Sequence, residues 1–176
     1  MSNKPKDSFP MYTLRLLTGQ ITAFSIALLM FSFLGMYIKD VNLLYILCSS
    51  VCIPVYFALM YSASWNIGRR DQNWVKHGYY KGNQLKPLIA TVIASSVGYL
   101  LFVMTLLYDN KVITLNAPAL FKIWYAPFYV LFDHFSTSIL AMITPLLLMP
   151  IAAWLGYFLG YRQISILHRL MYKQKK

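Results

Sequence analysis

Acidic residues are scarce in this sequence. The 176 residues contain no glutamate and only five aspartates, together with three histidines and two cysteines. Metal-dependent hydrolysis and phosphoryl transfer rely on spaced sets of carboxylate, histidine or cysteine side chains, and no such set is present. Cys48 and Cys52 lie one turn apart on a predicted helix, where we expect packing rather than a disulfide or a metal site. We therefore expect no catalytic residue, no metal and no cofactor.

Charge of either sign is also rare, at 12% of residues, whereas 59% are hydrophobic. Such a composition excludes an ordinary water-soluble domain. The apolar residues form long runs that are nearly free of charge, and about 18 such residues suffice for a transmembrane helix. The sequence predicts an all-α integral membrane protein, a single membrane domain (1–176) whose four transmembrane helices form a bundle. The predicted spans are 16–38, 43–65, 88–108 and 138–161. A cleaved signal peptide is the less favoured interpretation of the first, because its apolar run is longer than a signal peptide requires.

The cations fall mostly on one side of the predicted membrane. Lysine and arginine near helix ends are retained in the cytoplasm. A basic loop (66–87), the first 15 residues and a basic C-terminal tail (162–176) carry all lysines and arginines except three. The three exceptions are Lys39, Lys111 and Lys122. We therefore expect both termini to be cytoplasmic.

An aromatic segment, 116–135 within the outer connection 109–137, could be mistaken for a further span. It contains Lys122, Asp133 and two prolines, which are costly or disruptive in lipid. A fifth span would also place the basic tail outside. We expect the segment to lie at the outer surface or to enter the membrane as a re-entrant piece.

Small residues recur every four positions on the predicted helices, so that each row lies along one helix face. Small residues let helix backbones approach closely in lipid. The rows predict packing faces within a bundle or a homo-oligomer. They are Gly19, Ala23, Ala27 and Gly35, with Phe31 interrupting; Ser50, Ala58 and Ser62; Ala90, Ala94 and Gly98; and Ala152, Gly156 and Gly160.

Two short segments resemble each other. "WNIGRR" (65–70) and "YFLGYR" (157–162) share an aromatic residue, a glycine and an arginine at the same spacing. Both end a predicted helix on the cytoplasmic side. Two similar helical hairpins would explain the match. An interfacial aromatic residue followed by an arginine that reaches toward water would also explain it.

The stretch that follows Trp65 is unusually rich in polar residues for this apolar chain. They are Arg69, Arg70, Asp71, Asn73, Lys76, His77 and Lys81. Arginine binds phosphate with paired hydrogen bonds, so we expect contact with anionic phospholipid headgroups or with a partner protein. A contact from Arg70 to Asp71 or Asn73 would close the helix end. An enzyme acting on a lipid phosphate is an alternative, with Asp71 as base or metal ligand, His77 as acid or nucleophile, and the arginines holding the phosphate.

The loop "RRDQNWVKHGYYKG" (69–82) resembles a loop of small, uncharacterised multi-pass membrane proteins of Gram-positive bacteria. The resemblance implies a bacterial plasma membrane and no particular activity. From the residues we expect an interaction or accessory subunit of a larger membrane complex, with no role in nucleic-acid binding. A small-solute transporter or transporter subunit is the first alternative, and the lipid-phosphate enzyme is the second.

Overall fold

The computed structural model describes residues 9–79, 85–112, 114–134 and 139–164. These residues form helices and connections and contain no strand, so the all-helical expectation is confirmed for them. The helices are α1 (Phe9–Gly35), α2 (Val41–Lys76), α3 (Lys86–Ala94), α4 (Ser96–Asp109), α5 (Ala117–Trp124), the 3₁₀ helix η1 (Ala126–Phe128), α6 (Tyr129–His134) and α7 (Ile139–Tyr161).

Three of these helices are long and apolar enough to cross a membrane, namely α1, α2 and α7. The pair α3 and α4 is apolar enough as well, but it is bent by 56° at a short break. If the bent pair counts as one span, the described residues contain four candidates.

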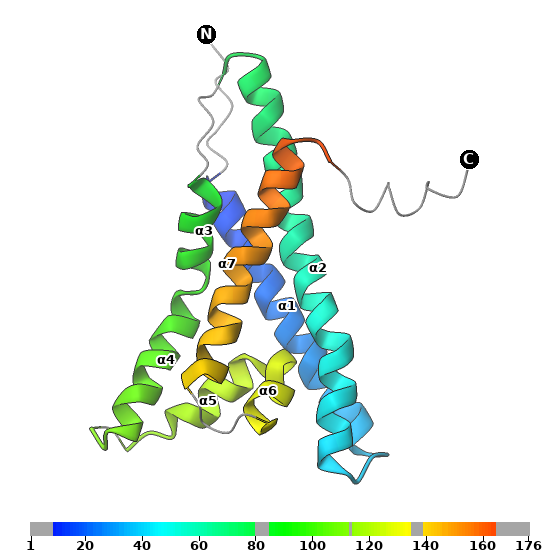
Figure 1. Ribbon diagram of the computed structural model, residues 1–176, viewed down its shortest axis with the longest axis vertical. Coiled ribbons are helices and arrows are strands. Elements are labelled where there is room, and N and C mark those ends of the chain that lie inside the picture. Colours follow the sequence, from blue (N-terminus) through cyan, green and yellow to red (C-terminus); the bar gives the residue numbers. More distant parts are fainter. Residues whose placement is uncertain (1–8, 80–84, 113, 135–138, 165–176) are drawn as a thin grey trace.

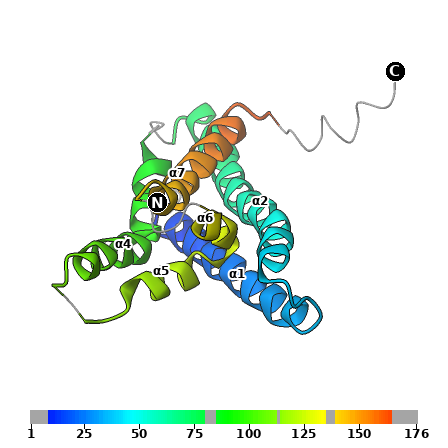
Figure 2. The ribbon, with the colours of Figure 1, turned by 60° about the horizontal axis from the view of Figure 1, so that its bottom comes forward.

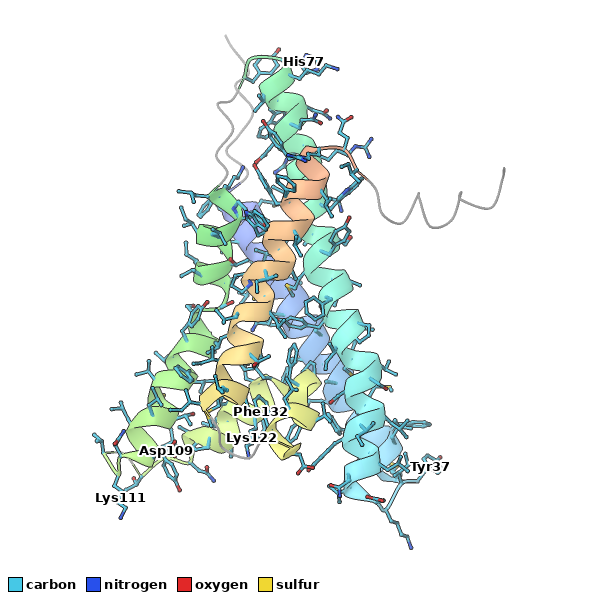
Figure 3. The ribbon with its side chains drawn as sticks, viewed as in Figure 1. Tyr37, His77, Asp109, Lys111, Lys122 and Phe132 are labelled. Atoms are coloured by element: carbon cyan, nitrogen blue, oxygen red, sulfur yellow. The ribbon has the colours of Figure 1, made fainter. Side chains whose placement is uncertain are left out.

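The long helices run roughly along the long axis of the molecule and spread apart toward the bottom of the view (Figure 1). His77 lies at one end, and Tyr37, Asp109, Lys111 and Lys122 lie at the other (Figure 3). We refer to these as the His77 end and the Lys111 end. From the His77 end, α1 runs to the Lys111 end and α2 returns, the bent pair α3–α4 runs down again, and α7 returns.

The aromatic segment folds across the Lys111 end as three short helices. Figure 2 shows α5 lying between α4 and α1, and η1 packs against both α1 and α2. Asn116 caps α5 by accepting a hydrogen bond from the Ala119 amide at 3.3 Å. Phe121 and Phe128 are fully buried. None of the three helices is long enough to cross a bilayer.

The helix α2 extends much farther than hydropathy predicts. It begins after Asp40, whose carboxylate accepts the Asn42 amide at 3.0 Å, and it continues through Trp65 to Lys76. It ends where Gly78 adopts a φ of 75°. Residues 66–76, which the sequence assigned to the basic loop, are therefore helical. Their arginines, glutamine and lysine are good helix formers, and hydropathy marks the part of a helix inside lipid rather than the whole helix.

The third predicted span is also not a single straight helix, because α3 ends at Ala94 and α4 begins at Ser96. No proline or glycine stands at the break. The Thr91 hydroxyl donates to the carbonyls of Pro87 and Leu88, a pattern that bends helices. The Ser95 hydroxyl meets the Met149 sulfur of α7 at 2.8 Å. The contact between Ser95 and Met149 depends on tertiary packing, so the sequence pattern alone did not reveal the bend.

Most of the small residues in the other three rows lie inside the structure. Those that are buried are Ala23, Ala27, Ala90, Ala94, Gly98, Ala152, Gly156 and Gly160. Gly19 is half-buried, and a Cβ there would meet the Met60 methyl group at 3.1 Å, whereas Gly35 is exposed.

The row predicted on α2 does not pack within the chain, because Ser50, Ala58 and Ser62 are exposed. The buried face of α2 instead carries Cys48, Cys52, Tyr56, Met60 and Ser64. Both cysteines are free. Larger side chains thus fill the buried face of α2. The prediction from small residue size pointed to the exposed face instead.

Candidate functional site

The two similar segments pack directly against each other where α2 and α7 cross. A Cβ at Gly68 would collide with the Tyr157 carbonyl, and a Cβ at Gly160 would collide with the Trp65 carbonyl. The aromatic residue of each segment therefore lies against the glycine of the other. The Trp65 indole also donates to the Ile164 carbonyl at 3.1 Å, just after the end of α7. This close crossing fixes the position of the polar stretch that follows on α2.

Asp71 lies immediately beyond this crossing and is fully buried. Its Oδ2 atom accepts a hydrogen bond from the Lys86 ammonium group at 2.7 Å and another from the Tyr157 hydroxyl at 3.1 Å. Lys86 is itself only 4% exposed. The three side chains come from α2, α3 and α7, so one carboxylate joins three helices at the His77 end.

The local sequence explains how Lys86 reaches this position. Lys86 is the first residue of α3, and Pro87 follows it within the first turn, where proline is favoured because its missing amide has no helical partner. Both residues are buried. Both charges must leave water to form this pair, and that desolvation cost offsets much of their attraction. We therefore regard the pair as fixing the relative positions of the helices rather than as a large source of stability. We refer to Asp71, Lys86 and Tyr157 as the Asp71 cluster.

The sequence did not identify this cluster. The expected contact of Asp71 with Arg70 was wrong, because the carboxylate pairs with Lys86 instead. The Arg70 guanidinium lies over the Trp74 ring, 5.0 Å from its centroid. No hydrogen-bond partner for its Nε and Nη2 atoms is found among the described residues. In the sequence, Lys86 is one cation of the basic loop, and nothing in its position points to Asp71.

The other polar residues of the stretch face outward. Arg69, Asn73, Lys76 and His77 are exposed, with His77 at the end of α2 (Figure 3). The Asn73 side chain accepts from Gln163 at 3.3 Å. Lys81 lies outside the described residues.

Two exposed arginines are held against aromatic rings near the crossing. The Arg69 guanidinium lies 5.6 Å from the centroid of the Trp65 ring. On α7, the Arg162 guanidinium lies 4.2 Å from the Phe158 ring. Each arginine thus packs on an aromatic side chain one turn earlier in the chain, with its charge at the surface.

The ends of the molecule differ in charge. The described parts of α1, α2, α3 and α7 toward the His77 end, with the residue that follows α7, include six cations and the buried carboxylate of Asp71. The cations are Arg15, Arg69, Arg70, Lys76, Lys86 and Arg162. At the Lys111 end, Figure 3 shows Lys111, Lys122 and Asp109, and the neighbouring connections and α6 add Lys39, Asp40 and Asp133, so that the described cations and carboxylates are equal in number. The His77 end is therefore basic, and the Lys111 end is neutral.

The catalytic arrangement considered from the sequence is not assembled. A general base needs a carboxylate that a substrate can approach, whereas Asp71 is buried against Lys86 and Tyr157. His77 is exposed at the end of the same helix. Within the described ranges, no three His, Cys, Asp or Glu side chains are grouped so that they could hold a metal ion.

Comparison of the chain with protein-family models, with curated proteins and with solved structures finds no match in any of the three.

Proposed function

We propose that this chain is a multi-pass protein of the bacterial plasma membrane, with both termini in the cytoplasm, and that it acts as an interaction or accessory subunit. Its basic His77 end contacts anionic phospholipid headgroups. The observation that carries the proposal is the difference in charge between the two ends. Positive side chains are retained on the cytoplasmic side of a membrane, where the leaflet is also rich in anionic lipid.

Arg69 and Arg162 are the residues best placed for lipid contact. Both are exposed, and they follow the two glycines that bring α2 and α7 together. Their packing on Trp65 and Phe158 holds the charges beside rings of the kind that occupy the membrane interface. Each such cation contributes about 1 kcal/mol to attraction by an anionic leaflet.

The end of α2 supplies a surface for a partner protein. At about 1.5 Å per residue, the 36 residues of α2 span roughly 54 Å, well beyond a hydrocarbon core of about 30 Å. The last turn of α7 lies beside Gly68, so the eight residues from Arg69 to Lys76 extend about 12 Å farther. The exposed Lys76 and His77 lie at the tip, where a cytoplasmic partner could reach them.

Lipid preference tests the headgroup contact. In nanodiscs of mixed phosphatidylglycerol and phosphatidylcholine, the Arg69→Gln/Arg162→Gln variant should lose about thirtyfold of the preference for phosphatidylglycerol, since each charge contributes about 1 kcal/mol. Native mass spectrometry of the retained lipids measures this preference. The matched control is Lys39→Gln/Lys111→Gln, which removes two charges from the other end and should change the preference little. Equal effects of the two double variants would contradict the proposal.

A photo-crosslinking residue at His77 tests the partner surface. We expect it to capture a protein in cells that the same residue at Lys111 does not capture. Capture of the same products from both positions would contradict a partner surface at the end of α2.

Solute transport, alone or as a subunit, is the second candidate. It is favoured by the bend between α3 and α4, because transporter sites are commonly formed by interrupted helices. Proteoliposomes that take up small neutral solutes faster than empty liposomes would support it, and equal rates would contradict it.

A further inference from the structure

The exposed face of α2 changes character along the helix. Large apolar side chains of α2 are exposed as far as Val51, and none is exposed in the remainder of the helix, all of which the structure describes. From position 62 to the end of the helix, every exposed residue is polar. These residues are Ser62, Asn66, Arg69, Asn73 and Lys76. We refer to them as the polar face of α2.

Ser64 fixes the depth at which the polar face begins. Its hydroxyl accepts a hydrogen bond from the Tyr12 hydroxyl of α1 at 2.9 Å. Leu14 and Ser62 each lie two residues from this bond toward the Lys111 end, because α1 and α2 run in opposite directions. At this depth Leu14 of α1 is 59% exposed, as in a helix that faces lipid, whereas α2 exposes a serine.

The Asp71 cluster fixes the depth of Arg69 in the same way. Lys86 of α3 donates to Asp71 at 2.7 Å, and α3 runs from there toward the Lys111 end. Ile89 lies three residues from this bond in that direction and Arg69 lies two. Ile89 is 47% exposed. The polar face thus extends from Ser62 to Arg69 at depths where α1 and α3 present large apolar side chains, so its chemistry does not suit a lipid surface.

The spacing of the polar face is that of a seam between two helices. Its residues alternate four and three positions apart, the pattern by which one helix contacts another along a narrow line. The α2 residues between them are buried or half-buried, so the face is a stripe rather than the broad polar surface of a helix in water. Serine and asparagine in membrane helices commonly hydrogen-bond to a neighbouring helix. A helix docked on this stripe would satisfy Ser62 and Asn66.

The charges of the polar face define the partner. Arg69 and Lys76 lie on one side of α2, two turns or roughly 10 Å apart. In a two-fold dimer of this chain the two α2 helices would be parallel, and each cation would face its own counterpart, which is unfavourable. We infer that the polar face docks a transmembrane helix of a different protein, which carries carboxylates about two turns apart at its cytoplasmic end. The inference rests on the proposed accessory role, and in the complex these carboxylates replace lipid headgroups beside Arg69.

Photo-crosslinking residues in the full-length protein, expressed in its native cells, test the docking. We expect Ser62 and Asn66 positions to give the same protein adduct. Mass spectrometry of the adduct should identify a membrane protein with acidic residues at the cytoplasmic end of a transmembrane helix. The matched controls are Leu14 and Ile89, which are exposed at similar depths on α1 and α3 and should give lipid adducts only.

Charge reversal tests the complementarity. In Arg69→Glu/Lys76→Glu, the yield of the Ser62 adduct should fall about tenfold or more, because the partner carboxylates would face like charges. The control, Lys39→Glu/Lys111→Glu at the other end, should leave the yield unchanged. Lipid adducts alone at Ser62, a captured protein without such an acidic helix, or a yield that survives the reversal would overturn the inference. Capture at His77 without capture at Ser62 would leave the accessory role in place and overturn the docking face alone.

Discussion

Asp71 has a structural role that its sequence neighbours do not indicate. In the sequence it stands among cations on a stretch expected to contact lipid headgroups. There its negative charge would leave the affinity for anionic lipid unchanged or lower it. In the structure it is buried between Lys86 and Tyr157. The same carboxylate therefore belongs to the internal framework, while its neighbours Arg69 and Asn73 remain at the surface.

Asp71→Asn should destabilise the protein strongly. The substitution removes the negative charge that pairs with the buried Lys86 ammonium group, and removing one member of a buried ion pair typically costs about 3–5 kcal/mol. Thermal unfolding in nanodiscs measures the loss. The matched control is Asp109→Asn, at an exposed aspartate of the Lys111 end, which should change the Tm little.

Replacing both charges should recover much of this loss. In Asp71→Leu/Lys86→Met no charge remains buried, and apolar replacements of buried ion pairs are often neutral. The double variant should thus be more stable than Asp71→Asn. A double variant that unfolds earlier than Asp71→Asn would show that Asp71 and Lys86 act separately rather than as a pair.

Part of the site could be anticipated at this scale. The sequence located the polar stretch and its outward cations, because a gathering of charge in an apolar chain is visible without a structure. It did not identify the partner of Asp71, since Lys86 lies 15 residues away and Tyr157 lies 86 residues away. Pairing over such distances is decided by how helices cross, which a local pattern does not contain.

Among the helices, the crossing of α2 and α7 depends most directly on individual residues. Gly156 faces the Tyr61 backbone, and Gly68 and Gly160 face the backbones of Tyr157 and Trp65. These neighbours are main-chain atoms, which cannot turn aside as a flexible side chain can. The repeated aromatic and glycine pattern therefore has a packing role, whether or not two hairpins share an origin.

Gly68→Ala and Gly160→Ala should each weaken the crossing. An added methyl group forces two backbones apart, and overpacking typically costs about 1–3 kcal/mol. The control is Gly35→Ala, where the nearest atom to a new Cβ is the end of the Leu44 side chain at 3.7 Å. Comparable Tm values for all three variants would show that the crossing is looser than described.

The sequence predicted the apolar spans of the helices better than it predicted where the helices end and which faces they bury. Long apolar runs identified α1, α2, the α3–α4 pair and α7, because hydrophobic length is a local property. The continuation of α2 past Trp65 was missed because its polar residues carry no hydropathy signal. The exposed row of Ser50, Ala58 and Ser62 shows that small size does not by itself select the buried face.

At the scale of the whole molecule, charge and shape combine to give an orientation. The basic His77 end holds the Asp71 cluster and the projecting end of α2, and the neutral Lys111 end holds the short helices α5, η1 and α6. If the bent pair α3–α4 crosses the membrane as one span, the connections α1–α2 and α4–α7 lie on one side of the membrane and the connection α2–α3 lies on the other. The proposed topology then places His77 and Arg162 in the cytoplasm and Lys111 outside.

Cysteine accessibility in intact cells tests this topology most directly. With Cys48 and Cys52 replaced by alanine, single cysteines at His77, Lys111 and Arg162 are exposed to a membrane-impermeant thiol reagent. The account predicts that Lys111→Cys reacts in intact cells, whereas His77→Cys and Arg162→Cys react only after permeabilisation. Equal labelling of His77→Cys and Lys111→Cys in intact cells would contradict it, because α3 and α4 would then not cross the membrane.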